Sequence, residues 1–201
     1  MVRLKDRYLL VSILYSDVPT GQSTGPVSDL LLYNQPSSGD LKPQHILKGI
    51  RTEVNNLFGD YGSGAVDRSL QGMMTHALYH HLNALTPPAV KYLSQATSTF
   101  ILRISRDHYR LVWAALSFMH HVPVKNGRSC VYRVVRVSGT IRKVEEEAVR
   151  RAKLFMLAAK EEAEGKASTG ALDALLRGNG PGHSNPMIVD QDDSGMDEDN
   201  D

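Results

Sequence analysis

The order of apolar segments along the chain constrains its fold more than any other feature of the sequence. Four short segments rich in β-branched and aromatic residues predict strands, and three longer segments with apolar residues at helical spacing predict helices. The order along the chain is β, α, β, β, α, β, α. The strands are expected at residues 7–15, 90–93, 99–105 and 129–137, and the helices from Pro43 to Gly59, from an N-cap at Asp107 to about residue 122, and from an N-cap at Thr140 to about residue 165.

This order is the split βαβ pattern of ferredoxin-like and RNA-recognition-like folds, with one helix added at the C-terminal end. The predicted fold class is α/β, an α+β sandwich in which helices cover one face of the sheet. Residues 1–164 are expected to form one domain with insertions at residues 16–42 and 60–88, which are rich in helix and strand breakers. Residues 165–201 are small, polar and acidic, and predict a disordered acidic tail.

The charge distribution is strongly asymmetric. The 23 lysines and arginines nearly balance the 22 acids, but residues 190–201 hold seven acids and no base, so residues 1–189 carry a net charge of +8. Residues 91–143 contain ten bases and one acid, and seven of the ten bases are arginines. This density favours a polyanionic partner, because the planar guanidinium binds phosphate through two hydrogen bonds. A solvated basic surface with no such partner is the alternative interpretation.

The sequence offers no catalytic or metal-binding constellation. The pairs His80-His81 and His120-His121 lack neighbouring cysteines or carboxylates to complete a zinc site, so they are interpreted as structural or surface residues. Cys130, the single cysteine, lies in a predicted strand without a nearby base and is expected to be a buried, inert thiol. The apolar runs are shorter than the roughly 20 residues of a membrane-spanning helix. We therefore expect an intracellular protein that is not in the membrane.

The start of the last predicted helix carries the most informative local pattern. Gly139 and Thr140 are followed by Arg142 and Lys143 in the first helical turn. Bases here oppose the helix dipole, which favours anions at this end by about 0.3–1 kcal/mol per charge. A phosphate held by backbone N–H groups and both bases would resolve the conflict. The alternative is that the two bases form ion pairs with glutamates four residues later.

The segment 99–105 argues against base readout by an aromatic platform. It lacks the Lys/Arg-Gly-Phe/Tyr signature of RNA-recognition motifs, and its one aromatic residue, Phe100, lies on the predicted apolar face. Binding of structured RNA through its shape and backbone therefore fits better than readout of single-stranded bases.

Three segments resemble one family. They are MVRLKDRYLL at residues 1–10, HYRLVWAAL at 108–116 and VSGTIR at 137–142. In this order they are similar to the Pop/Rpp small protein subunits shared by ribonuclease P and ribonuclease MRP, in particular to the fifth Pop protein. The resemblance covers most of residues 1–15, 43–59 and 89–160.

The resemblance implies a non-catalytic subunit that binds and stabilises the catalytic RNA. That RNA would remove the 5′ leader of precursor tRNA or process precursor rRNA. The implied Mg²⁺ ions lie on the RNA, and no cofactor is bound by the protein. The implied partners are the catalytic RNA, the roughly thirty-kilodalton TIM-barrel-like subunit and other Pop/Rpp subunits, in the nucleus and nucleolus.

The predicted RNA contacts share a positive charge or a place at the start of the last helix, and they lie in or beside the matching segments. They are Arg3, Lys5, Arg7, Arg103, Arg106, Arg110, Arg136, Gly139, Thr140, Arg142 and Lys143. Two other classes of function stay open. A protein-interaction module of another RNA-processing complex would use the helix at 111–119 or the last helix as its docking face. A small ferredoxin-like enzyme would need an acid–base pair or a defined nucleophile, which the chain does not show.

Overall fold

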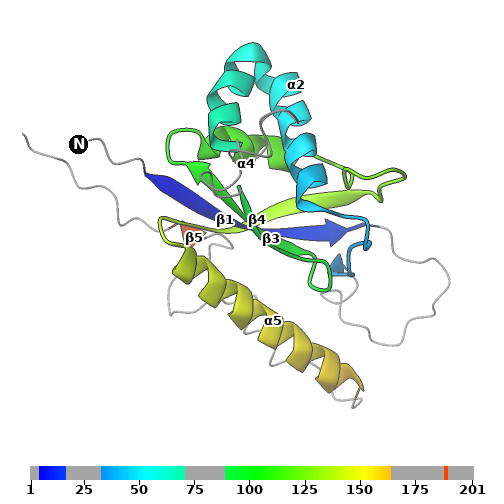
Figure 1. Ribbon diagram of the computed structural model, residues 1–201. Coiled ribbons are helices and arrows are strands. Elements are labelled where there is room, and N and C mark those ends of the chain that lie inside the picture. The colour runs from blue at the N-terminus through cyan, green and yellow to red at the C-terminus, as the bar shows by residue number, and fades with distance from the viewer. Residues whose placement is uncertain (1–4, 17–32, 71–88, 164–187, 190–201) are drawn as a thin grey trace, which may run out of the picture.

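One sheet forms the centre of the molecule (Figure 1). The computed structural model describes residues 5–16, 33–70, 89–163 and 188–189. The strands lie in the order β2-β3-β1-β4-β5, with antiparallel neighbours except for the parallel pair β4–β5. This order confirms the ferredoxin-like α+β prediction. The elements are β1 (Asp6–Tyr15), α2 (Pro43–Leu70), β2 (Val90–Ser94), β3 (Thr99–Ser105), α4 (Tyr109–Phe118), β4 (Cys130–Ser138), α5 (Ile141–Ala163) and β5 (Ile188–Val189).

The main core lies between the sheet and helices α2 and α4, which cover the same face (Figure 1). Successive side chains of a strand point to opposite faces, so every second residue of β1 enters this core. Leu9, Val11 and Ile13 are fully buried there. Their partners from the helices include Ile46, Ile50 and Val54 of α2 and Val112, Ala115 and Leu116 of α4.

Helix α5 covers part of the opposite face, where it packs against β1 and β4 (Figure 1). A second, smaller core forms there from Leu10, Ile101, Val135 and Val144, each at most 2% exposed. The sheet is thus enclosed on both faces near its centre. The prediction that one face carries helices is confirmed, and the added C-terminal helix supplies the other layer.

Helix α5 also contains a buried charge. The Glu147 side chain is 5% exposed and accepts hydrogen bonds of 2.7–2.8 Å from Arg150 and Arg151. Burial alone would raise the pKa of this carboxyl, but the hydrogen bonds and charges of the two guanidiniums outweigh burial and lower its pKa. Glu147 is therefore held ionised by two arginines of its own helix.

A bulge divides β4 into two registers. Leu10 pairs with Arg136, whereas the next residue, Val11, pairs with Val134, so Val135 is an extra residue on β4. The bulge keeps both faces apolar: Val134 and Val137 face the main core although three positions separate them, and Val135 faces α5.

Three predicted helix boundaries differ from the structure. Helix α4 was expected to extend to about residue 122, but it ends at Phe118, with Met119 as its C-cap. Helix α2 was expected to end at Gly59, but it kinks there, with φ 59° and ψ −152°, and then resumes to Leu70. Part of the predicted insertion 60–88 thus belongs to the fold, since Val66 and Leu70 are buried in the main core. The N-cap of α4 is His108, with no side-chain hydrogen bond, rather than Asp107. The rest of that insertion lies outside the described residues.

Of the predicted tail, the structure describes only β5; residues 164–187 and 190–201 lie outside the described part.

Candidate nucleic-acid interface

The strand register gathers the predicted RNA contacts at one end of the sheet. Strand β1 begins at this end, and its neighbours β3 and β4 both finish there. Tyr8 of β1 pairs with Arg103 of β3 on one side and with Ser138 of β4 on the other. Cations far apart in the sequence therefore become neighbours because the central strands are antiparallel.

Short contacts tie this end together. The backbone N–H of Arg106 donates to the carbonyl of Lys5 at 2.9 Å, which joins the end of β3 to the start of β1. A Cβ on Gly139 would lie 3.3 Å from the Arg7 Nη1 atom, so this guanidinium lies against the turn between β4 and α5. We call this region the basic end; its members are Lys5, Arg7, Lys91, Arg103, Arg106, Arg110, Arg136, Arg142 and Lys143.

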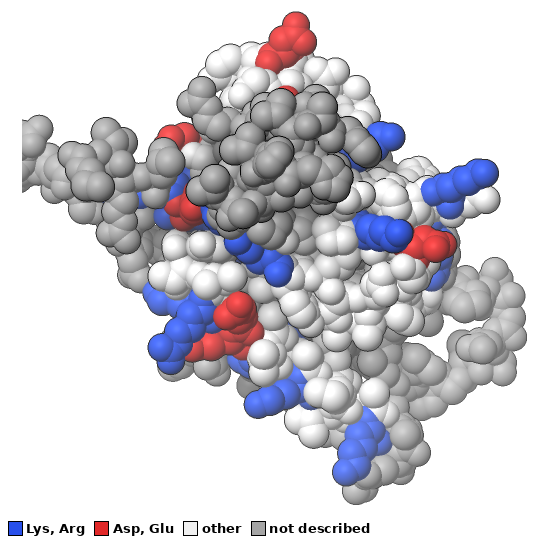
Figure 2. Space-filling model, in the orientation of Figure 1, with Lys and Arg blue, Asp and Glu red and all other residues white. Residues whose placement is uncertain are grey.

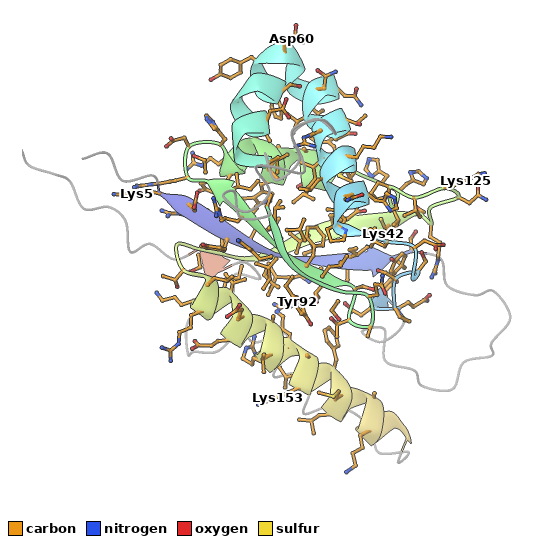
Figure 3. All side chains as sticks on the ribbon, viewed as in Figure 1. Lys5, Lys42, Asp60, Tyr92, Lys125 and Lys153 are labelled. Atoms are coloured by element: carbon orange, nitrogen blue, oxygen red, sulfur yellow. The ribbon has the colours of Figure 1, made fainter. Side chains whose placement is uncertain are left out.

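Side chains of the basic end differ in exposure. The Arg142 side chain is 87% exposed, and Lys5 and Arg110 are also exposed. Arg7 is 9% exposed, so it places its charge beneath the surface rather than on it. Figure 2 shows lysine and arginine side chains on the left of the molecule near the start of α5, and Figure 3 places Lys5 at that end. Arg3 lies outside the described residues.

Asp6 lies among the cations contributed by β2 and β3. The Arg103 Nε atom lies 3.2 Å from a carboxylate oxygen of Asp6, and both side chains are about one third exposed or less. Lys91 is close to the same pair. Burial, then repulsion from Arg103, lowers the Lys91 pKa, and attraction to Asp6 partly opposes this shift. Lys91 is absent from the predicted contacts, although the β2–β3 hairpin places it beside Arg103.

The first turn of α5 has the properties expected of a phosphate site. It contains no acidic residue, and Gly139 and Thr140 are exposed. The Thr140 N–H donates to the Ser138 hydroxyl at 3.2 Å. Arg142 forms the expected ion pair with Glu146 at 3.0 Å. Such an exposed i,i+4 pair contributes only about 0.3–0.5 kcal/mol, so Glu146 holds the Arg142 side chain weakly.

The face under α5 has a single aromatic side chain on its central strands, Tyr8 of β1, which is half-buried against the smaller core, so no aromatic platform forms there. Phe100 is fully buried in the main core, as predicted, and α5 packs over β1 and β4. Tyr92 of β2, 50% exposed, pairs with Ile101 at the margin of this face. Its exposure depends on how far α5 reaches across the sheet, which the sequence does not reveal.

The histidines, the cysteine and the apolar helices are the other candidates for a metal, thiol or membrane site. Within residues 5–16, 33–70, 89–163 and 188–189, no three His, Cys, Asp or Glu side chains gather as a metal site requires. His120 and His121 are exposed, and His80-His81 lies outside the described residues. Cys130 is 2% exposed, which confirms the expected buried thiol. No helix in the described part of the chain is long and apolar enough to cross a bilayer.

Comparison with known proteins matches this sequence to one family. A sequence model described as the Rpp14/Pop5 family matches residues 7–149. The chain belongs to the Rpp14/Pop5 family. The family match spans the antiparallel strands, the β4–α5 turn and the first turns of α5, and stops before β5.

Individual relatives confirm the resemblance to Pop/Rpp proteins. A protein of Schizosaccharomyces pombe named ribonuclease P/MRP protein subunit POP5 is 39% identical over 153 residues, covering 76% of this chain and 89% of the relative. The Saccharomyces cerevisiae protein of the same name is 34% identical, covering 75% and 77%. The human protein of that name is 33% identical over 143 residues, covering 71% and 66%.

Proposed function

We propose that this chain is a non-catalytic protein subunit of ribonuclease P and ribonuclease MRP, and that it binds and stabilises their RNA through the basic end. The names of the Rpp14/Pop5 relatives support the subunit role. The observation that carries RNA binding is the convergence of cations from β1, β3, β4 and α5 at one end of the sheet. That arrangement suits a phosphate backbone better than any single segment does.

The chemistry of the basic end favours structured RNA. Arginine forks bind phosphate oxygens, and clustered cations reduce the repulsion between packed RNA helices. The RNA would supply the reacting groups for removing the 5′ leader of precursor tRNA and for processing precursor rRNA. Mg²⁺ would be held by RNA oxygens. We further propose contact with a TIM-barrel-like subunit and other Pop/Rpp proteins, and a nuclear and nucleolar location.

One further observation favours protein contacts as well. Helix α5 exposes three apolar side chains, Val149, Met156 and Leu157, at 53%, 65% and 52%. Exposed apolar residues on one helix are typical of protein docking faces. This surface is compatible with a ribonucleoprotein subunit, which must contact both RNA and protein. A protein-interaction module that binds no RNA would have the same kind of surface.

The affinity for a structured RNA, measured by fluorescence anisotropy over a range of salt concentrations, tests the role of the basic end. The double variant Arg142→Ala/Lys143→Ala should bind more weakly, and the slope of log K against log salt should fall by roughly one for each phosphate that the variant no longer neutralises. The matched control is Lys42→Ala/Lys125→Ala, which removes two exposed cations away from Lys5 (Figure 3).

Equal weakening in the two double variants would show that binding follows net charge and not the basic end. Purification of the tagged chain from its own cells at moderate and high salt, followed by sequencing of bound RNA, tests the particle. Recovery of ribonuclease P or MRP RNA is expected. Recovery of proteins without a specific RNA would favour the interaction module.

A further inference from the structure

The short strand β5 has a direction that determines where the chain goes next. Ile188 pairs with Arg136 and Val189 pairs with Val137, in parallel with β4. Because the two strands run the same way, β5 points toward Ser138 and the turn that begins α5. An antiparallel β5 would point toward the opposite end of β4, at Cys130. Figure 1 shows β5 beside the start of α5.

The sequence that follows β5 is the most acidic in the protein. Residues 190–201, here called the acidic tail, carry seven carboxylates and no base. Asp190 is bonded to Val189, and consecutive Cα atoms are about 3.8 Å apart. Twelve residues span at most about 43 Å. The strands from β5 to β3 are spaced by roughly 5 Å each, so the whole basic end is within reach of the acidic tail.

We propose that the acidic tail competes with RNA for the basic end, with β5 as its tether. The inference rests on the proposed RNA-binding function and goes beyond it, because the tail lies outside the segment matched by the family. A short tether gives a high effective concentration, on the order of millimolar, so weak contacts between exposed charges suffice. The apparent affinity for RNA then falls in proportion to the fraction of molecules in which the tail does not occupy the basic end.

Charge complementarity supports this occupant. The first turn of α5 has no acid of its own, although a helix N-terminus favours anions, and its Arg142 side chain is 87% exposed. Among the described residues, five acids lie near the basic end: Asp6, which pairs with Arg103, Glu146, which pairs with Arg142, Glu147, which pairs with Arg150 and Arg151, and the exposed Asp107 and Glu145. The nine cations of the basic end still exceed these five carboxylates, so a net positive charge remains there for a second group of carboxylates.

Two full-length variants separate placement of the tail from its charge. In the neutral-tail variant, the seven acids become Asn or Gln. In the tether variant, Ile188→Pro/Val189→Pro, the charges stay but both backbone donors of β5 are removed. A fluorescent stem-loop RNA should bind the neutral-tail variant about fivefold more tightly than wild type in about 0.05 M salt, and less than about twofold more tightly in about 0.5 M salt. The tether variant should show part of this gain.

Each outcome decides a different question. Tighter binding by the neutral-tail variant with wild-type binding by the tether variant would show a net-charge effect and overturn the proposal. Unchanged binding by both variants would also overturn it and leave the RNA-binding function standing. Failure of every variant to bind RNA would instead refute the proposed function. In an Arg142→Ala/Lys143→Ala background, the gain from the neutral tail should shrink, because part of the tail's target is gone.

Discussion

Replacing Glu147 with glutamine tests how much a buried ion-pair cluster within α5 stabilises the fold. The buried carboxylate accepts three hydrogen bonds from Arg150 and Arg151, whose side chains are 30% and 19% exposed. Glutamine keeps the shape but removes the charge. Breaking a buried ion pair costs about 3–5 kcal/mol. Because both guanidiniums still reach water, we expect Glu147→Gln to lower the free energy of unfolding by about 2–3 kcal/mol.

The destabilisation should depend on pH with a defined sign. The folded-state pKa of Glu147 is lowered, whereas the unfolded chain titrates near the ordinary glutamate value of 4.5. A group with a lowered folded-state pKa stabilises the protein fully above its unfolded pKa, and this stability is lost as the pH falls through the folded value. The difference between wild type and Glu147→Gln should therefore be full at neutral pH and shrink below about pH 4.5.

Thermal unfolding followed by circular dichroism measures both effects. A destabilisation of about 2–3 kcal/mol corresponds to a fall in Tm of roughly 4–12 °C for a chain of this size. Glu146→Gln is the matched control, because its carboxylate pairs with Arg142 at 3.0 Å but is 62% exposed. This variant should change stability by no more than about 0.5 kcal/mol. Equal Tm shifts for the two variants, or a Glu147→Gln penalty that does not change with pH, would refute the reasoning.

Two further substitutions test the packing. Gly127→Ala should destabilise the protein in urea unfolding, because a Cβ there would lie 1.8 Å from the Val122 carbonyl oxygen; Gly39→Ala, with nothing within 4 Å, should be nearly neutral, and similar midpoints would contradict this. Phe100→Ala should cost about 3–5 kcal/mol, because the ring is fully buried and meets the Tyr132 ring edge-on at 6.3 Å; a cost below about 1 kcal/mol would mean that the core closes around the gap.

The sequence predicts those elements whose burial follows a simple period. Strand β3 has the predicted bounds because Phe100, Leu102 and Ile104 recur at every second position and are all buried in the main core. Ile101, between them, is buried on the other face beneath α5. The predicted end of α2 is wrong for a tertiary reason. Gly59 breaks the helix locally, as its φ of 59° shows, but burial of residues beyond it makes the helix resume. A glycine in the sequence predicts a local break in the helix, but not whether buried residues beyond it make the helix resume.

The sequence predicted the individual segments of the candidate site, but not that these segments form one surface. Arg142 and Lys143 stand out because they oppose the helix dipole in a short local pattern. That they lie near Arg103 follows only from the strand order, which the βαββαβ pattern supplies. Strand β5 was not predicted as part of this end, because its place depends on pairing with a strand about 50 residues earlier in the chain, and its short apolar run has no periodic pattern. Lys91 was not among the predicted contacts either, although it lies in a local hairpin whose two strands were both predicted.

The extra residue in β4 has a consequence for how this chain can change over evolution. In a regular strand, deletion of one residue would turn every later side chain to the wrong face. Deletion of Val135 would leave the later side chains on their present faces, because the bulge already interrupts the alternation between Val134 and Val137. Deleting that residue would restore a regular ladder, keep both flanking valines in the main core and remove only one side chain from beneath α5. A gap of one residue among relatives is thus best tolerated at this position of the strand.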